Sequence, residues 1–180
     1  MQEISQVPVE SLVFLDEAGI NLGMSRSHAR APIGERAFAK RASKGGNISL
    51  VGAVRTTGMC GLYPYDGPID GFRFLDFLSN QLLPNLHQGD VVVMDNLRVH
   101  HIAAVETLLS TVGDRPLFLP PYSPEKNPIE EIWSLIKNIF RTAEARTIAA
   151  MVETLKKAHK AVTTDKIKAY FRHAGYGLLD

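Results

Sequence analysis

Apolar runs in the first two thirds of the chain are short and separated by polar or glycine-rich segments. Residues 10–16 (ESLVFLD) and 90–94 (DVVVM) are apolar at successive positions, a pattern typical of strands covered on both faces. A further short strand is expected at 115–119. The prolines of the segment 120–128 then exclude regular structure.

A hairpin is predicted in the middle of the N-terminal half. Residues 47–57 and 59–65 are strand-like and flank a turn that begins at Gly58. The preceding segment, 17–46, is rich in Arg, Ala, Gly and Ser and shows no sustained period. We interpret it as a long loop that contains a short strand near 36–38.

Apolar positions at helical spacing recur from residue 70 to the C-terminal part of the chain. They predict helices at residues 70–83, 101–109, 128–141, 147–161 and 163–172. Pro128 suits the first position of its helix, where a missing N–H is no loss. The resulting order of strands and helices predicts a mixed α/β sheet with a helical C-terminal part. We expect one domain over 1–180, with a core at about 10–142 and C-terminal helices at about 146–173.

Length and composition are those of an ordinary globular domain. The chain has 180 residues, of which 45% are hydrophobic and 22% charged, so a sizeable core can form without disulfides or metals. Its single cysteine, Cys60, excludes an internal disulfide and a cysteine-cluster zinc site. The apolar runs are too short to cross a bilayer, and the first residues do not resemble a signal peptide.

Charge is distributed unevenly, although the net charge is only +1. The segments 26–44 and 137–172 carry net charges of +5 and +6, which leaves a net of about −10 on the remaining residues. A phosphate-binding surface beside a carboxylate site would show this distribution. Solvated loops and a solvated helix face would show it equally well.

Three carboxylates are candidates for chemistry because of where they lie. Asp16 is expected at the end of the strand 10–16, and Asp95 directly after the strand 90–94. Glu130 is expected in the first turn of a helix. Ligands of open α/β sheets gather beyond the strand ends, and convergent carboxylates favour Mg²⁺ or Mn²⁺. Two such ions can drive phosphoryl transfer. Taken singly, each acid is also an ordinary turn former, helix cap or partner of a helix dipole.

Helix geometry distinguishes Glu130 from its neighbour Glu131. An apolar stripe forms along the helix that follows Pro128, from Ile129, Ile132, Trp133, Ile136 and Phe140. Glu130 lies roughly 110° from the centre of the stripe and Glu131 roughly 150°, so Glu131 points mostly to solvent. Lys137 shares the flank of Glu130 and is either a phosphate contact or a plain surface lysine. The stripe position of Trp133 favours a core role over base stacking.

Three blocks of sequence carry a family resemblance: FLDEAG at 14–19, VVMDNLRVHH at 92–101 and LPPYSPEKNPIEEIWSLIK at 119–137. In this order they resemble the DDE catalytic core of transposases of the Tc/mariner superfamily, and most closely its bacterial insertion-sequence members. The 34 residues between Asp95 and Glu130 match the spacing of that superfamily.

The resemblance implies an RNase H-like fold with a five-stranded mixed sheet flanked by helices. It implies that Asp16, Asp95 and Glu130 are the catalytic triad and bind two Mg²⁺ (or Mn²⁺) ions. The implied enzyme nicks double-stranded DNA at transposon ends and joins the freed 3′-hydroxyl to target DNA, typically at TA. The implied enzyme would act as a homo-oligomer on DNA and would not bind a membrane. It would be located in the bacterial cytoplasm and would associate with the nucleoid when bound to DNA.

Further candidates for DNA contact or for support of the site come partly from the same resemblance. Asn96 orients Asp95 or caps the following helix, and His100 contacts DNA phosphate or adjusts protonation. The basic loop adds Arg26, Arg30, Lys40, Arg41 and Lys44 as predicted DNA contacts. The helix-turn-helix domains of full-length relatives are expected to be absent, because only about 15 residues precede Asp16.

Two alternatives to a transposase stay open from the sequence. One is an RNase H-like nuclease or resolvase, and the other is a catalytically silent DNA-binding remnant. The helices after Thr147 bind DNA, pack on the core or mediate dimerisation, and the sequence does not choose among these roles.

Overall fold

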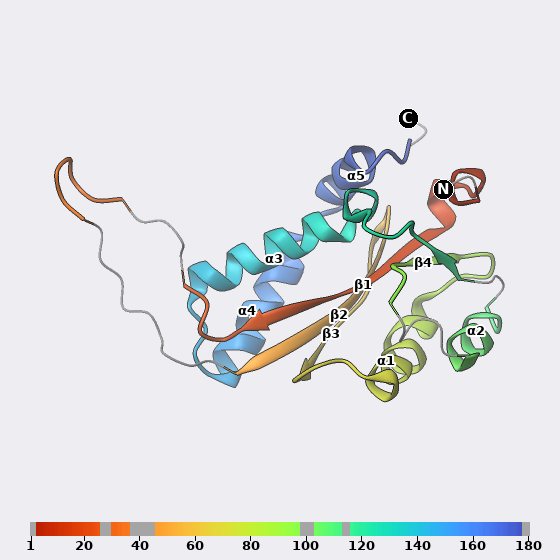
Figure 1. The fold of residues 1–180 in the computed structure, drawn as a ribbon, viewed down its shortest axis with the longest axis horizontal. Helices are drawn as coiled ribbons and strands as arrows, with labels where there is room; N and C mark the ends of the chain where they lie inside the picture. Colours follow the sequence, from red (N-terminus) through yellow and green to blue (C-terminus); the bar gives the residue numbers. More distant parts are fainter. Residues whose placement is uncertain (1–2, 26–29, 37–45, 98–102, 113–115, 178–180) are drawn as a thin grey trace.

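The computed structural model describes residues 3–25, 30–36, 46–97, 103–112 and 116–177 (Figure 1). Five strands form one sheet in the order β3-β2-β1-β4-β5. Their bounds are Leu12–Asn21 (β1), Asn47–Arg55 (β2), Gly58–Asp66 (β3), Val91–Met94 (β4) and Leu117–Phe118 (β5). β1, β2 and β3 pair antiparallel, whereas β4 runs parallel to β1 and to β5, so the sheet is mixed as expected.

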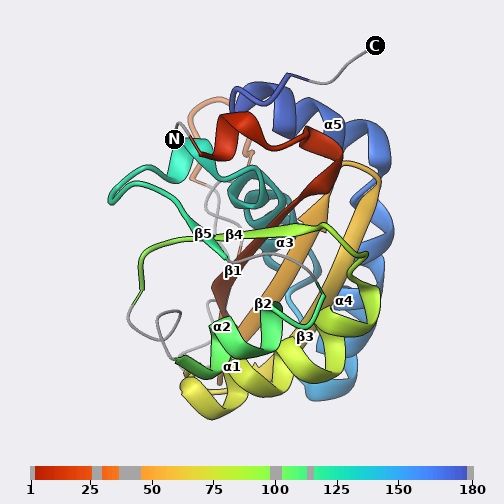
Figure 2. The ribbon, with the colours of Figure 1, turned by 90° about the vertical axis from the view of Figure 1, so that its right-hand side faces the viewer.

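Helices cover both faces of the sheet (Figure 2). The α-helices are Gly71–Phe77 (α1), Ala103–Leu109 (α2), Ile129–Ala143 (α3), Ile148–Ala161 (α4) and Thr164–His173 (α5). Short 3₁₀ turns occupy Ile4–Gln6, Val9–Ser11, Leu83–Asn85 and Pro124–Lys126. The helices α1 and α2 pack on one face, and α3, α4 and α5 pack on the other.

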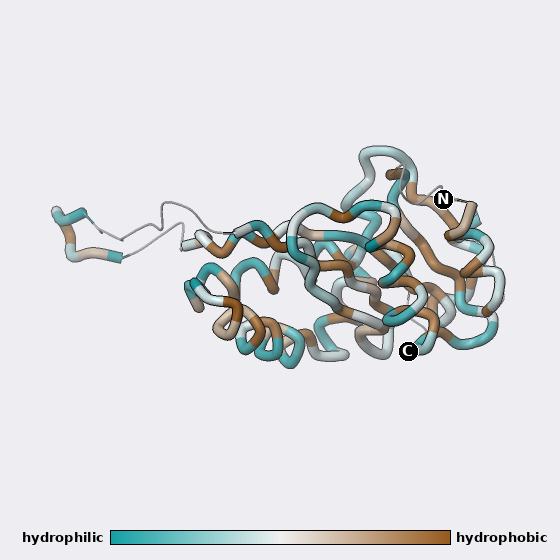
Figure 3. Tube along the Cα trace, turned by 90° about the horizontal axis from the view of Figure 1, so that it is seen from below, coloured by the Kyte–Doolittle hydropathy of each residue, from teal (hydrophilic) through white to brown (hydrophobic). Residues whose placement is uncertain are grey.

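The alternation of side chains along β1 divides the core into two layers. Val13 and Leu15 face α1 and α2, whereas Phe14 and Ala18 face the layer of α3, α4 and α5. Figure 3 shows hydrophobic segments inside the body of the molecule and hydrophilic segments on its outer turns. Asp16 shares the parity of Phe14 and therefore points from the central strand towards α3.

The two C-terminal helices pack on the core. Met151 and Ala158 of α4 and Ile167 and Phe171 of α5 are buried in the same cluster as α3. Phe171 also packs edge-on against Phe14 of β1, with ring centroids 5.4 Å apart. Of the three roles left open by the sequence, core packing is thus observed. No helix in the described part of the chain is long and apolar enough to cross a membrane.

Two predicted element boundaries were wrong. Asp16 does not close its strand, because β1 continues to Asn21 and pairs with β2 along that length. The helix predicted at 70–83 is α1 only to Phe77, then a π-helical turn at Leu78–Leu82 and a 3₁₀ turn. Asp70 caps α1 by accepting a hydrogen bond from the Arg73 N–H at 2.9 Å. The strand expected at 36–38 falls mostly outside the described residues.

A buried ion pair fixes the start of β4 to the far end of β2. The Arg55 guanidinium donates from Nη2 to Asp90 Oδ2 at 2.7 Å and to the Asn85 carbonyl at 2.7 Å. Its Nε lies 3.1 Å from Cys60 Sγ on β3. Asp90 also accepts the His87 N–H at 2.6 Å. Because Arg55 and Asp90 are both buried, each charge depends on the other for compensation.

We predict that Asp90→Ala destabilises the protein by about 3–5 kcal/mol, because it leaves the Arg55 charge buried without its anion. Urea unfolding measures the effect. The exposed Glu153–Lys156 pair provides the control, and Glu153→Gln should leave the free energy of unfolding nearly unchanged. Equal stability of Asp90→Ala and the wild type would contradict the proposed dependence of the fold on the Arg55–Asp90 ion pair.

Candidate active site

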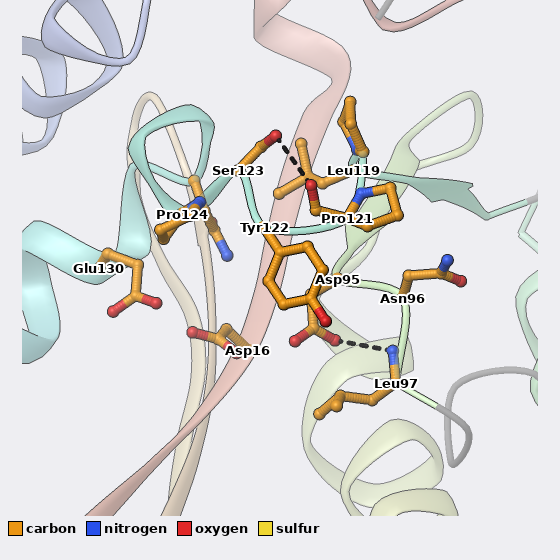
Figure 4. A pocket seen from close by; sticks show the side chains of 12 residues that line it. Asp16, Asp95, Asn96, Leu97, Leu119, Pro121, Tyr122, Ser123, Pro124 and Glu130 are labelled. Atoms are coloured by element: carbon orange, nitrogen blue, oxygen red, sulfur yellow. Dashed lines mark hydrogen bonds between the residues drawn. The ribbon is translucent and has the colours of Figure 1, made fainter.

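A cavity of about 400 Å³ opens beside the ends of β4 and β5 (Figure 4). Asp16 of β1, Asp95 after β4 and Glu130 of α3 all line it. The remaining lining residues are Asn96, Leu97, Asn127 and the segment 119–124. Three acids that are far apart in sequence therefore meet at one hollow.

Sheet register places Asp95 next to Asp16. In the parallel pairing of β1 with β4, Phe14 lies opposite Val93. Continuing that register by two residues sets Asp16 alongside Asp95. The strand β4 ends at Met94, so Asp95 leaves the ladder and is only partly buried. Its Oδ1 accepts the N–H of Leu97 at 3.2 Å, which orients the carboxylate.

Asp16 is the buried acid, with 7% of its surface exposed. The indole of Trp133 donates from Nε1 to Asp16 Oδ2 at 3.0 Å. The pKa of Asp16 is raised from 3.8 to about 7, chiefly by burial and also by the charges of Glu130 and Glu17. Hydrogen bonds from the Glu17 N–H and from Trp133 act in the opposite direction and lower it. The site is thus built to hold this carboxylate in an environment that penalises its charge.

A glycine on β2 makes room for the indole. Gly52 lies opposite Asp16 in the antiparallel pairing of β1 and β2. A Cβ at Gly52 would lie 2.7 Å from Trp133 Cη2, well inside contact distance. The absence of a side chain at Gly52 lets Trp133 lie against the sheet and reach Asp16.

Glu130 reaches the cavity from the first turn of α3. Asn127 lies two residues before the helix and holds its first turn: its carbonyl accepts the Glu130 N–H at 3.1 Å, and its Oδ1 accepts the Ile129 N–H at 3.4 Å. Glu130 is exposed at the cavity. Glu131 points instead towards α5, where it pairs with His173 Nδ1 at 3.1 Å. Only the first of the two adjacent glutamates faces the other acids.

The other predicted site residues that the structure describes do not face the three carboxylates. Asn96 lines the cavity, but Figure 4 shows its amide directed away from the three carboxylates. Lys137 is half-buried on α3 and does not line the cavity. Arg30 is exposed and also lies outside the lining. Arg26, Lys40, Arg41, Lys44 and His100 lie outside the described residues.

The donor set fits a divalent metal, although the acids are not assembled around one point. Carboxylate oxygens are the ligands that Mg²⁺ and Mn²⁺ prefer. Within the described ranges, no group of three or more His, Cys, Asp or Glu is close enough to hold one ion. Mg²⁺ commonly takes one or two carboxylates together with water and substrate phosphates, so pairs of these acids suffice. A bound cation would also compensate the negative charge of the buried Asp16 carboxylate.

Residues 11–152 match the family described as "DDE superfamily endonuclease". The chain belongs to this family. It is also 26% identical over 161 residues to a transposable element Tc1 transposase of Caenorhabditis elegans, a match that covers 83% of this chain and 59% of the Tc1 protein.

Solved structures of Mos1 transposase share the fold of this DDE chain. A paired-end complex with the left transposon end superposes with a TM-score of 0.74 at 19% identity, over 92% of this chain and 52% of that one. The Mos1 catalytic domain alone gives a TM-score of 0.65 at 16% identity, over 92% and 76%. The match thus spans 59% of the Tc1 protein and 52% of the Mos1 chain in the paired-end complex. The RNase H-like fold predicted from the sequence is confirmed.

The sequence pattern did not predict the contacts of two residues that hold the acids of this cavity. Trp133 is in the core as predicted, at 1% exposure, but the prediction overlooked its hydrogen bond to Asp16. A buried indole N–H needs a hydrogen-bond acceptor, and this requirement could have indicated a polar partner for Trp133. Asn127 lies in the third sequence block, but the pattern does not indicate that its side chain accepts the Ile129 N–H just before α3.

We predict that Gly52→Ala disturbs the site through Trp133. The added methyl group collides with the indole and should cost about 1–3 kcal/mol in the free energy of unfolding. Trp133 is the only tryptophan, so its fluorescence spectrum reports the displacement directly. Gly19→Ala is the control, because nothing lies within 4 Å of a Cβ at that position of β1. An unshifted Trp133 spectrum in Gly52→Ala would disprove the contact.

We predict that Asp16→Asn stabilises the metal-free protein at pH 8 but not at pH 4. The folded pKa of Asp16 lies above 3.8, so its stabilising contribution is complete below 3.8 and is lost as the pH rises to about 7. Above that pH the free energy of unfolding of Asp16→Asn should exceed that of the wild type by on the order of 2–4 kcal/mol, since the amide carries no charge and its oxygen still accepts from Trp133. Thermal melts of both proteins across pH 4–8 test this. A stability difference that does not change with pH would refute it.

Proposed function

We propose that this chain is the catalytic domain of a DDE transposase that cuts DNA at transposon ends and joins the freed 3′-hydroxyl to target DNA. The convergence of Asp16, Asp95 and Glu130 on one cavity carries the proposal. Membership of the DDE family and similarity to Tc1 transposase support it. These matches do not favour the nuclease or the silent-remnant alternative.

The three acids are proposed to hold two Mg²⁺ or Mn²⁺ ions. When bound, the ions would activate the attacking oxygen and stabilise the leaving oxygen of a phosphodiester. Trp133 and the Glu17 N–H fix the orientation of the Asp16 carboxylate. Asn127 anchors the helical turn that presents Glu130. These contacts fix the Asp16 carboxylate and the helical turn of Glu130 before DNA binds.

DNA is the proposed partner. Mos1 transposase has been solved in paired-end complexes with Mn and with Mg and in a strand transfer complex. By extension, we propose that this chain binds double-stranded DNA with TA-containing targets and acts as a homo-oligomer. We propose DNA or site contacts for Asn96, His100, Lys137, Arg26, Arg30, Lys40, Arg41 and Lys44 on the family resemblance and on charge.

The finer assignment to the bacterial insertion-sequence branch rests on the sequence blocks around the three acids. With it goes the proposed place of action, the bacterial cytoplasm and its nucleoid. These statements follow from the resemblance.

We predict that Asp95→Asn lowers Mn²⁺-dependent nicking of supercoiled plasmid DNA by more than about 100-fold, because it removes a metal-binding oxygen. Asp66→Asn, an exposed acid at the end of β3, should nick like the wild type. Circular dichroism should show both variants folded. Joining of precut ends by the wild type separates a transposase from a nuclease.

Absence of nicking by the wild type, or equal nicking by Asp95→Asn, would contradict the proposed function. Cleavage without any joining of precut ends would favour the nuclease.

A further inference from the structure

Tyr122 is an unusual residue at the mouth of the acid-lined cavity. It lines that cavity, yet its side chain is 101% exposed. In the described part of the chain its side chain forms no hydrogen bond and no ring contact. Figure 4 shows the ring projecting from its loop on the side where Asp16 and Asp95 lie. A large aromatic surface is thus presented to whatever occupies the cavity.

The backbone of Tyr122 is also strained. Its φ is +56°, a left-handed conformation that costs a bulky residue free energy which glycine or asparagine would avoid. Among the described residues, Glu144 is the other non-glycine residue with positive φ, and there the conformation ends α3 in the ordinary way. Tyr122 ends no helix. Its conformation serves instead to aim the side chain outward from a loop stiffened by Pro120, Pro121 and Pro124.

The burial of Asp16 restricts how a DNA strand can approach it. Asp16 is 93% covered, so a phosphate that shares a metal ion with it must enter the cavity. A nucleotide that is drawn out of a duplex into a pocket loses the stacking of its base. An unstacked base loses its neighbours, and an aromatic ring at the rim can replace them. Leu97, half-exposed on the same lining, offers a second apolar surface.

We propose that Tyr122 stacks on an unpaired nucleobase next to the scissile phosphate and so positions the strand over the acids. The inference rests on the proposed function, because it takes DNA as the substrate. Tyrosine suits this role because its ring is rigid and loses little side-chain freedom on binding. Stacking reads the face of a base, so the contact tolerates any sequence. The hydroxyl is not required.

The experiment uses a forked DNA duplex that carries 2-aminopurine at its first unpaired position, with Ca²⁺ in place of Mg²⁺. Wild type and Tyr122→Phe should quench the probe equally, because both keep the ring. Tyr122→Gly should not quench it, and its affinity for the fork should fall about 5- to 100-fold. Affinity for a fully paired duplex should stay unchanged.

Tyr122→Gly separates stacking from folding. Glycine fits a φ of +56°, so its melting temperature should equal or exceed that of the wild type. Phe72→Ala removes a different exposed aromatic ring, 81% exposed on α1, and should bind and quench like the wild type.

The inference is overturned if Tyr122→Gly quenches and binds the fork like the wild type, or if the wild type does not quench the probe. In either case the Asp95→Asn nicking assay still reports on the proposed function separately. Loss of nicking in Asp95→Asn with normal fork binding by Tyr122→Gly would leave the transposase intact and remove only the stacking role.

Discussion

The hydrogen bond from Trp133 to Asp16 is the interaction on which the site depends. Asp16 lies in the middle of the central strand, where a charge is costly, and its carboxylate needs a donor. Trp133 supplies that donor only because Gly52 leaves space for the indole. The helix that carries Trp133 also carries Glu130 one turn earlier. One packing contact therefore sets the positions of two of the three acids.

The rest of the fold holds this contact in place. Parallel pairing of β1 with β4 brings Asp95 beside Asp16. The helices α4 and α5 bury their apolar faces against the layer of α3 and keep it on the sheet. At the other end of β2 and β4, Arg55 and Asp90 fix the strands by a buried ion pair. The strand β1 carries Asp16, the helix α3 carries Glu130, and Asp95 directly follows β4, while the proline-rich loop shapes the rim of the cavity.

Much of this arrangement could be predicted from the sequence. Short apolar runs located the strands, and helical spacing located α3, α4 and α5 to within two residues. The extension of β1 past Asp16 was missed because its pairing with β2 overrides a broken apolar pattern. The π-helical turn after Phe77 was missed because its buried residues, Leu78 and Leu82, are four positions apart, a spacing that an α-helix also shows. The contacts of Trp133 and the conformation of Tyr122 depend on tertiary packing, which no periodicity reports.

The most direct test of the account is the position of Mn²⁺ ions in a crystal of the wild-type protein with DNA, located by anomalous scattering. The account predicts manganese peaks within coordination distance of Asp16, Asp95 and Glu130, with the Trp133 hydrogen bond intact. Manganese bound elsewhere, or any one of the three carboxylates lying outside coordination distance of every manganese peak, would contradict it.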